Sequence, residues 1–202
     1  MDSIAAVELS THRLKLRYAT GDDAPALLEL GSEPEVTRFF SWGPYRSLKE
    51  PAAYVERLAG ERARGERLEF LIIGESGPIG VTGLSEFSRR DRRAVVGTWL
   101  GRAHWGSGAN GRSKALISWL AFERLGLERL GAYADLDNLR SQAALLKLGF
   151  AREGTLRRWH RQGDGVHEVV LYSWLKEEWQ RSPLSQESVE IRGLAPDAFR
   201  IA

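Results

Sequence analysis

The chain of 202 residues is 43% hydrophobic and 28% charged, which suits a soluble protein built around one core. Its net charge of +2 is too small to indicate a nucleic-acid surface, and no apolar run approaches the roughly 20 residues of a membrane helix. It has no cysteine and only four scattered histidines, so no disulfide, thiolate or metal-ligand pattern is present. The N-terminus does not resemble a signal peptide. We therefore expect a cytoplasmic protein that binds neither metal, membrane nor nucleic acid.

The residues before position 105 predict one strand, two helices and then an antiparallel sheet. Alternating apolar and charged residues indicate strands with one buried face. Ser47 with Glu50 forms a capping-box pattern at a helix start. The arginine-rich run at 89–93 is typical of a solvated hairpin tip. In order, these patterns predict a strand at 12–19, a helix at 24–30, an irregular aromatic segment at 32–45, a helix at 47–64, and strands at 69–74, 78–87 and 94–101.

The residues after position 111 predict two helices, a strand and a closing hairpin. The order β-α-α-β-β-β-α-β-α-β-β predicts an α/β fold whose mixed, mostly antiparallel sheet has one parallel strand pair and helices on both faces. Residues 1–181 should form one domain. Residues 182–202 should form a tail that could be flexible or contact a partner. The later elements are a helix ending at 126, a strand at 129–135, a helix at 138–148, strands at 150–159 and 166–174, a helix at 176–181 and a short strand at 189–191.

The segment 105–111, Trp-Gly-Ser-Gly-Ala-Asn-Gly, connects a predicted strand to a predicted helix. Its three glycines allow backbone N–H groups to point inward, and the start of the helix adds a partial positive charge. Arg112 and Lys114 place cations at the same helix start, which is easier to explain if an anion binds nearby. The segment therefore predicts a pyrophosphate site, with a purely structural turn as the alternative.

The same glycines also match the dinucleotide-binding pattern Gly-x-Gly-x-x-Gly, with Asp135 as a candidate ribose ligand. That fold requires further parallel strand–helix units. The chain instead predicts antiparallel strands before the turn and a hairpin after residue 150. The predicted elements thus disfavour an NAD-binding protein, which is the competing interpretation only if the glycines are considered alone.

Several short motifs follow one another between residues 13 and 179. They include Pro34-Glu35-Val36-Thr37-Arg38, Gly97-Thr98-Trp99-Leu100, Trp105-Gly106-x-Gly108-x-Asn110, Asp135-x-x-Asn138-x-Arg140-Ser141 and Leu148-Gly149-Phe150. Together and in this order they resemble the GCN5-related N-acetyltransferase (GNAT) superfamily, and within it the RimJ/RimL-like branch. The resemblance implies an acetyltransferase that moves the acetyl group of acetyl-CoA to a primary amine, such as a protein N-terminus, without a metal.

The resemblance also implies which residues hold the co-substrate. The strands at 94–101 and 129–135 should splay apart around the pantetheine arm, and the glycine-rich turn should bind the phosphates. A homodimer is common in this family and is one expected assembly. The implied cofactor-binding residues are Trp99, Leu100, Gly106, Ser107, Gly108, Ala109, Asn110, Gly111, Asn138 and Ser141.

For the chemistry, the resemblance implies Glu86 as the base that accepts the amine proton, with a surface glutamate as the alternative. The tyrosine that many members use to protonate the departing thiolate is replaced by Leu145, so Ser141 becomes the candidate acid. Glu153 and His160 are reserve candidates for the base. The acceptor pocket is expected at the aromatic residues Phe40, Trp42 and Trp159.

Two other functions remain open. One is acetylation of a small-molecule amine, such as an antibiotic or a polyamine. The other is a non-catalytic protein that binds acyl-CoA, because Arg112-Ser113 stands where members commonly have Glu-Ala and the usual tyrosine is absent.

Overall fold

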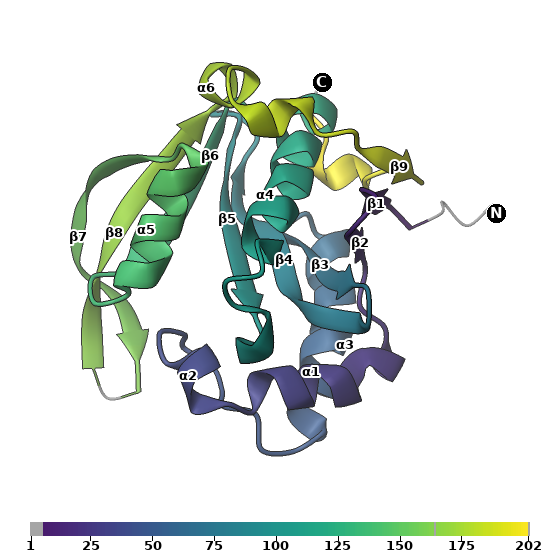
Figure 1. Cartoon of the computed structure of the whole chain (residues 1–202), viewed down its shortest axis with the longest axis vertical. Helices are drawn as coiled ribbons and strands as arrows, with labels where there is room; N and C mark the ends of the chain where they lie inside the picture. Colours follow the sequence, from purple (N-terminus) through teal and green to yellow (C-terminus); the bar gives the residue numbers. More distant parts are fainter. Residues whose placement is uncertain (1–5, 164, 202) are drawn as a thin grey trace.

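The computed structural model describes residues 6–163 and 165–201, which form one nine-stranded sheet (Figure 1). The strand order is β7-β8-β6-β5-β4-β3-β2-β1-β9, and β5 with β6 is the parallel pair within these ranges. This confirms the predicted fold class. The strands are β1 (Glu8–Ser10), β2 (Lys15–Arg17), β3 (Arg67–Gly74), β4 (Gly77–Ser88), β5 (Arg93–Leu100), β6 (Arg129–Asp135), β7 (Ala151–Gln162), β8 (Gly165–Leu175) and β9 (Glu190–Arg192).

Helices pack on both faces of the sheet. On one face, Leu116 and Ile117 of α4 belong to the main core together with Phe70 of β3. Side chains alternate along a strand, so Leu71 faces the other way, where it packs with Leu27 of α1. The helices are α1 (Ala24–Gly31), α2 (Pro34–Thr37), α3 (Lys49–Ala63), α4 (Ala109–Trp119), α5 (Leu139–Leu148) and α6 (Lys176–Gln180).

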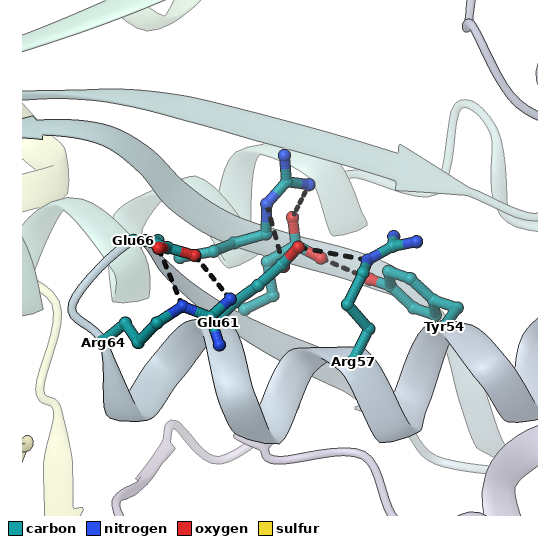
Figure 2. A network of polar contacts seen from close by, with 7 residues as sticks. Tyr54, Arg57, Glu61, Arg64 and Glu66 are labelled. Carbon is teal, nitrogen blue, oxygen red and sulfur yellow. Dashed lines mark hydrogen bonds and ion pairs between the residues drawn. The ribbon is translucent and has the colours of Figure 1, made fainter.

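Helix α3 is joined to β3 by a network of polar side chains (Figure 2). The Tyr54 hydroxyl donates a hydrogen bond to Glu69, which also pairs with Arg67 at 2.8 Å. Glu61 pairs with Arg57 at 3.1 Å and with Arg67 at 3.5 Å. Burial raises the pKa of Tyr54 well above its ordinary value, and the Glu69 carboxylate adds to that effect. The network fixes α3 on the same sheet face as α1.

Two parts of the N-terminal half differ from the expectation. The strand predicted at 12–19 is shorter, because the backbone N–H of Thr11 donates to the carbonyl of Leu14 and closes a turn. After β2 the chain bends toward α1, where both oxygens of Asp23 accept hydrogen bonds from Arg17 at 2.7 Å. The segment 32–45 also contains the short helix α2, which was not expected.

The residues after α6 lie against the rest of the fold. The strand expected at 189–191 is present as β9, with bounds shifted by one residue. It pairs with β1, which the sequence did not predict. Phe199 is 1% exposed and lies 4.7 Å from Phe87 between ring centroids. The backbone N–H of Ile201 donates to the carbonyl of Leu125, just beyond the π-helical turn that follows α4.

Candidate active site

The site begins where the parallel strands β5 and β6 separate. They pair at three positions, of which Val95 with Gly131 is the last. Beyond it, β6 continues along β8 while β5 continues along β4, so their facing backbone edges diverge (Figure 1). The predicted residues Trp99 and Leu100 pair with β4, but they lie on a stretch of β5 that is no longer paired with β6. Backbone groups of this stretch that face β6 can therefore hydrogen-bond a ligand in the gap.

The glycine-rich turn closes the end of β5 and opens α4. Gly106 and Gly108 have φ of 76° and 80°, the left-handed region that glycine adopts without strain. A Cβ at Gly106 would have no atom within 4 Å, so the space beside it is open. The indole N–H of Trp105 donates to the carbonyl of Leu100 at 2.9 Å and fixes the turn against the strand. The turn thus presents the N-terminus of α4 toward open space.

Arg112 supplies the charge at this turn. Its Nη2 donates to the carbonyl of Ser107 at 3.1 Å, so the guanidinium folds back over the glycines. Its Nε is buried and has no hydrogen-bond partner among the described residues. Nearby, the guanidinium of Arg140 lies 3.3 Å from the ring centroid of Trp105. A buried unsatisfied donor beside a helix N-terminus and a second cation fits an anionic group such as a pyrophosphate.

Glu86 lies on β4 in a bulge, where the pairing with β5 shifts between Ser85 and Ser88. Its φ of 51° is unusual for a residue with a side chain and marks local backbone strain. Its carboxylate accepts a hydrogen bond from the Tyr133 hydroxyl of β6 at 3.2 Å. Sequence reasoning missed Tyr133. Tyr133 lies between Ala132 and Ala134 of β6, which face the main core. The alternation of side chains along a strand could therefore have indicated that Tyr133 projects from the opposite face of the sheet.

Comparison with known proteins identifies this arrangement. The family model described as the acetyltransferase (GNAT) domain matches residues 13–151. The chain belongs to the GNAT acetyltransferase family. This confirms the predicted family and makes the protein an acetyltransferase, and the family uses acetyl-CoA as its acetyl donor.

Individual relatives agree with this assignment. "Uncharacterized N-acetyltransferase YoaA" of Bacillus subtilis (strain 168) is 31% identical over 170 residues, which cover 83% of this chain and 96% of that protein. A crystal structure of an acetyltransferase from T. thermophilus is 34% identical with a TM-score of 0.76, covering 89% of this chain and 94% of that one. The ribosomal-protein-serine acetyltransferase of Escherichia coli (strain K12) is 31% identical over 111 residues, 54% of this chain and 62% of that protein.

In this GNAT protein, the start of α5 lies just beyond the open end of β6. Asn138 is the N-cap of α5, and its Oδ1 accepts a hydrogen bond from the backbone N–H of Ser141 at 3.1 Å. The Ser141 hydroxyl is half-buried and makes no hydrogen bond to any described residue. Leu145 is 3% exposed and packs in the core. Ser141 thus supplies a hydroxyl near the start of α5, whereas Leu145 is enclosed in the core.

The aromatic residues predicted for the acceptor lie in two groups. Phe40 stacks on Trp42 at 5.3 Å between ring centroids, and Trp42 lies 5.1 Å from Trp99 of β5. Trp159 of β7 lies 6.0 Å from Tyr133 and is 53% exposed. The two groups thus flank the diverging ends of β5 and β6. The structure does not join them into one cluster.

The backbone of β7 bulges beside Trp159. The pairing with β8 shifts between Leu156 and His160, and Arg158 has a φ of 53°. An open hollow of about 580 Å³ follows this bulge and is lined by residues 155–159 and Glu168. The bulge therefore shapes the surface next to the Trp159–Tyr133 contact.

Glu153, a reserve candidate for the base, is engaged elsewhere. Both of its oxygens accept hydrogen bonds from Arg129, at 2.8 and 2.7 Å, and Ser173 donates to it as well. These contacts lower the pKa of Glu153 to about 2, chiefly through Arg129. A carboxylate held this way accepts a proton poorly near neutral pH. His160 lies opposite His167 in the β7–β8 pairing.

Lys114 does not lie beside the glycine-rich turn as the sequence suggested. It points into the protein, is 5% exposed, and its Nζ donates to the Thr98 hydroxyl of β5 at 2.7 Å. Thr98 in turn lies 2.7 Å from Thr82, which donates to the carbonyl of Gly97. Burial lowers the pKa of Lys114 to about 7. The Lys114 side chain therefore connects α4 to β5 inside the protein.

Residues 6–163 and 165–201 hold no cluster of three or more histidine, cysteine, aspartate or glutamate side chains placed to bind a metal. Within the same ranges, every helix is too short or too polar to cross a membrane.

Proposed function

We propose that this acetyltransferase acetylates a primary amine of the protein N-terminus class at the gap between β5 and β6. The observation that carries the proposal is the divergence of these strands beside the glycine-rich turn and the unsatisfied Nε of Arg112. A thioester can lie in the gap while the phosphates rest at the start of α4. The co-substrate and the acceptor amine can then approach the same point from opposite sides of the sheet.

On this proposal the backbone of Trp99 and Leu100 holds the pantetheine arm. Gly106, Ser107, Gly108, Ala109, Asn110 and Gly111 surround the pyrophosphate, and Asn138 with Ser141 faces the other side of the co-substrate from α5. The geometry supports this set because all of these residues lie around the gap between β5, β6, α4 and α5. Acetyl-CoA then supplies the acetyl group, and the protein supplies positioning and donors for the developing oxyanion.

The chemistry requires the amine nitrogen to lose a proton as it attacks. An N-terminal α-amine has a pKa of about 8, so a useful fraction is neutral at pH 7, whereas a lysine amine near about 10.4 needs more help. Glu86 accepts the proton, directly or through water, and Ser141 donates one to the departing thiolate. Such a base typically contributes about 10²–10⁴-fold to the rate. Phe40, Trp42 and Trp159 contact the acceptor.

The name of one relative supports a protein acceptor, because the E. coli protein is named a ribosomal-protein-serine acetyltransferase. That match covers about half of this chain, so a small-molecule amine is the second candidate acceptor. We place the reaction in the cytoplasm on the sequence patterns of the chain, and we propose a homodimer on the family resemblance.

Acetyl-CoA binding is tested with a matched pair of glycine variants. Gly106 and Gly77 both have positive φ, and neither has an atom within 4 Å of a built Cβ. Gly106→Val should weaken CoA binding at least tenfold in calorimetry, because its side chain would enter the phosphate space, whereas Gly77→Val carries only the backbone strain. Equal affinities for the two variants would contradict the proposed phosphate site.

Turnover is tested separately by thiol release from acetyl-CoA with a panel of N-terminal peptides, polyamines and aminoglycosides. Acceptor-dependent release with peptides carrying a free α-amine, and not with N-acetylated copies, is the expected result. Release only with small amines would move the assignment to the second candidate. CoA binding without any acceptor-dependent release would identify a non-catalytic acyl-CoA-binding protein.

A further inference from the structure

Tyr133 connects the two strands that flank β5. It lies on β6 two residues beyond Gly131, the last residue paired with β5. Because Ala132 and Ala134 face the main core, Tyr133 projects from the opposite face of the sheet. Its hydroxyl reaches Glu86 of β4 at 3.2 Å. The Tyr133–Glu86 contact therefore crosses β5 at the point where β5 and β6 separate.

The surface beside this contact is open. Gly97 of β5 is exposed, and a Cβ built on it would meet no atom within 4 Å. Gly97 follows Val95 by two residues, and Val95 pairs with Ser85, the neighbour of Glu86. Farther along β5, Trp99 contacts Trp42. Gly97 thus forms an open floor between the Tyr133–Glu86 contact and the Trp42–Trp99 contact.

Glu86 needs a partner if its carboxylate is to stay at this floor. The residue is exposed, and a free glutamate side chain samples many rotamers. Tyr133 is held more firmly, because its ring lies beside Trp159. Burial raises the pKa of Tyr133, and the Glu86 carboxylate raises it further, so the phenol keeps its proton and remains a donor.

We infer that Tyr133 is a positioning residue that holds the Glu86 carboxylate at the open floor above Gly97, where it accepts the proton of the acceptor amine. The inference rests on the proposed function. In the step it serves, the amine nitrogen forms a bond to the acetyl carbon, the carbon–sulfur bond breaks, and CoA departs as a thiolate that takes a proton from Ser141. The amine proton moves to Glu86, and the proton of Tyr133 stays in place.

A double-mutant cycle tests the role of Tyr133. Tyr133→Phe should lower kcat/KM for the acceptor about tenfold, the usual loss when a hydrogen bond to a charged group is removed, and leave KM for acetyl-CoA unchanged. In a Glu86→Gln background it should cause no further loss. The matched control, Tyr172→Phe, removes a hydroxyl that contacts Gln142, also at 3.2 Å, and should keep the wild-type rate.

Two results of this cycle would overturn the inference. The first is a wild-type rate in Tyr133→Phe. The second is a pair of losses that multiply in the double variant, since independent effects mean that Tyr133 does not act through Glu86.

A second measurement is independent of turnover. NMR titration of labelled tyrosine should show a lower pKa for Tyr133 in Glu86→Gln, because the carboxylate that raises it is gone. Arg93 and Arg129, which lower the same pKa, are present in both proteins. An unchanged pKa would refute the contact even in an active enzyme. If the pKa of Tyr133 falls in Glu86→Gln but the wild-type protein acetylates no amine, the proposed function is refuted and the contact stands.

Discussion

Lys114 is a buried lysine of α4, with a threonine hydroxyl of β5 as its hydrogen-bond partner. Desolvation alone lowers its pKa from 10.5 to about 7. Between these two values the unfolded chain binds a proton at this position and the folded chain does not. Stability therefore increases with pH across this window, because the unfolded state holds more protons. At and below pH 7 the full cost of the buried amine is present.

We predict that Lys114→Met is more stable relative to the wild type at pH 7 than at pH 9.5. The difference between the two pH values should be on the order of 3 kcal/mol, since each pKa unit corresponds to about 1.4 kcal/mol. Urea unfolding of both proteins at the two pH values measures it. Lys147→Met, at an exposed lysine of α5, should show no such pH dependence. A pH-independent Lys114→Met effect would mean that this amine does not titrate on folding.

At the scale of elements, Asn138 has both a local and a proposed functional role. As the N-cap of α5 it accepts a hydrogen bond from the backbone N–H of Ser141, and as a site residue it faces the proposed co-substrate. Asn138→Ala should cost about 1 kcal/mol of stability through loss of the cap. Asn138→Asp is an equally good cap, so it should restore the melting temperature.

The same pair of variants separates the two roles. An aspartate beside a phosphate-bearing ligand adds repulsion, so Asn138→Asp should still raise KM for acetyl-CoA. If Asn138→Asp restores both the melting temperature and KM, then Asn138 is a helix cap and no more.

Elements with strong local patterns were predictable, and contacts between distant elements were not. The pattern of Ser47 and Glu50 does mark a helix start, with the Ser47 N–H donating to Glu50 at 2.8 Å, although the N-cap is Leu48 and the helix begins at Lys49. Glu86 was found through the family resemblance. Its partner Tyr133 is 47 residues away and meets it only because β4 and β6 lie on either side of β5. The inward turn of Lys114 likewise depends on how α4 packs over β5.

Strand β1 shows the same limit, whereas the strand expected at 189–191 is present as β9. β1 is three residues long, too short for an alternation pattern to be recognised, and one of its pairing partners, β9, is about 180 residues away. Sequence patterns of period two need four or more residues to stand out. The sheet order could be proposed from the family resemblance only for its central strands.

For the whole molecule, the question is whether residues 182–201 fold together with the acetyltransferase domain. Phe199 is buried against Phe87 of β4, and β9 extends the sheet through β1. We expect Phe199→Ala to cost about 3 kcal/mol in a single urea transition, as for other large residues removed from a core. Leu194→Ala, in the same tail but 60% exposed, should change stability by less than about 0.5 kcal/mol. Equal, small effects of both variants would instead make the tail an independent appendage. Phe199 packs on Phe87 in the β4 bulge, whereas the proposed phosphate site lies at the start of α4. Loss of its ring should therefore lower the melting temperature without changing KM for acetyl-CoA at temperatures where the variant is folded.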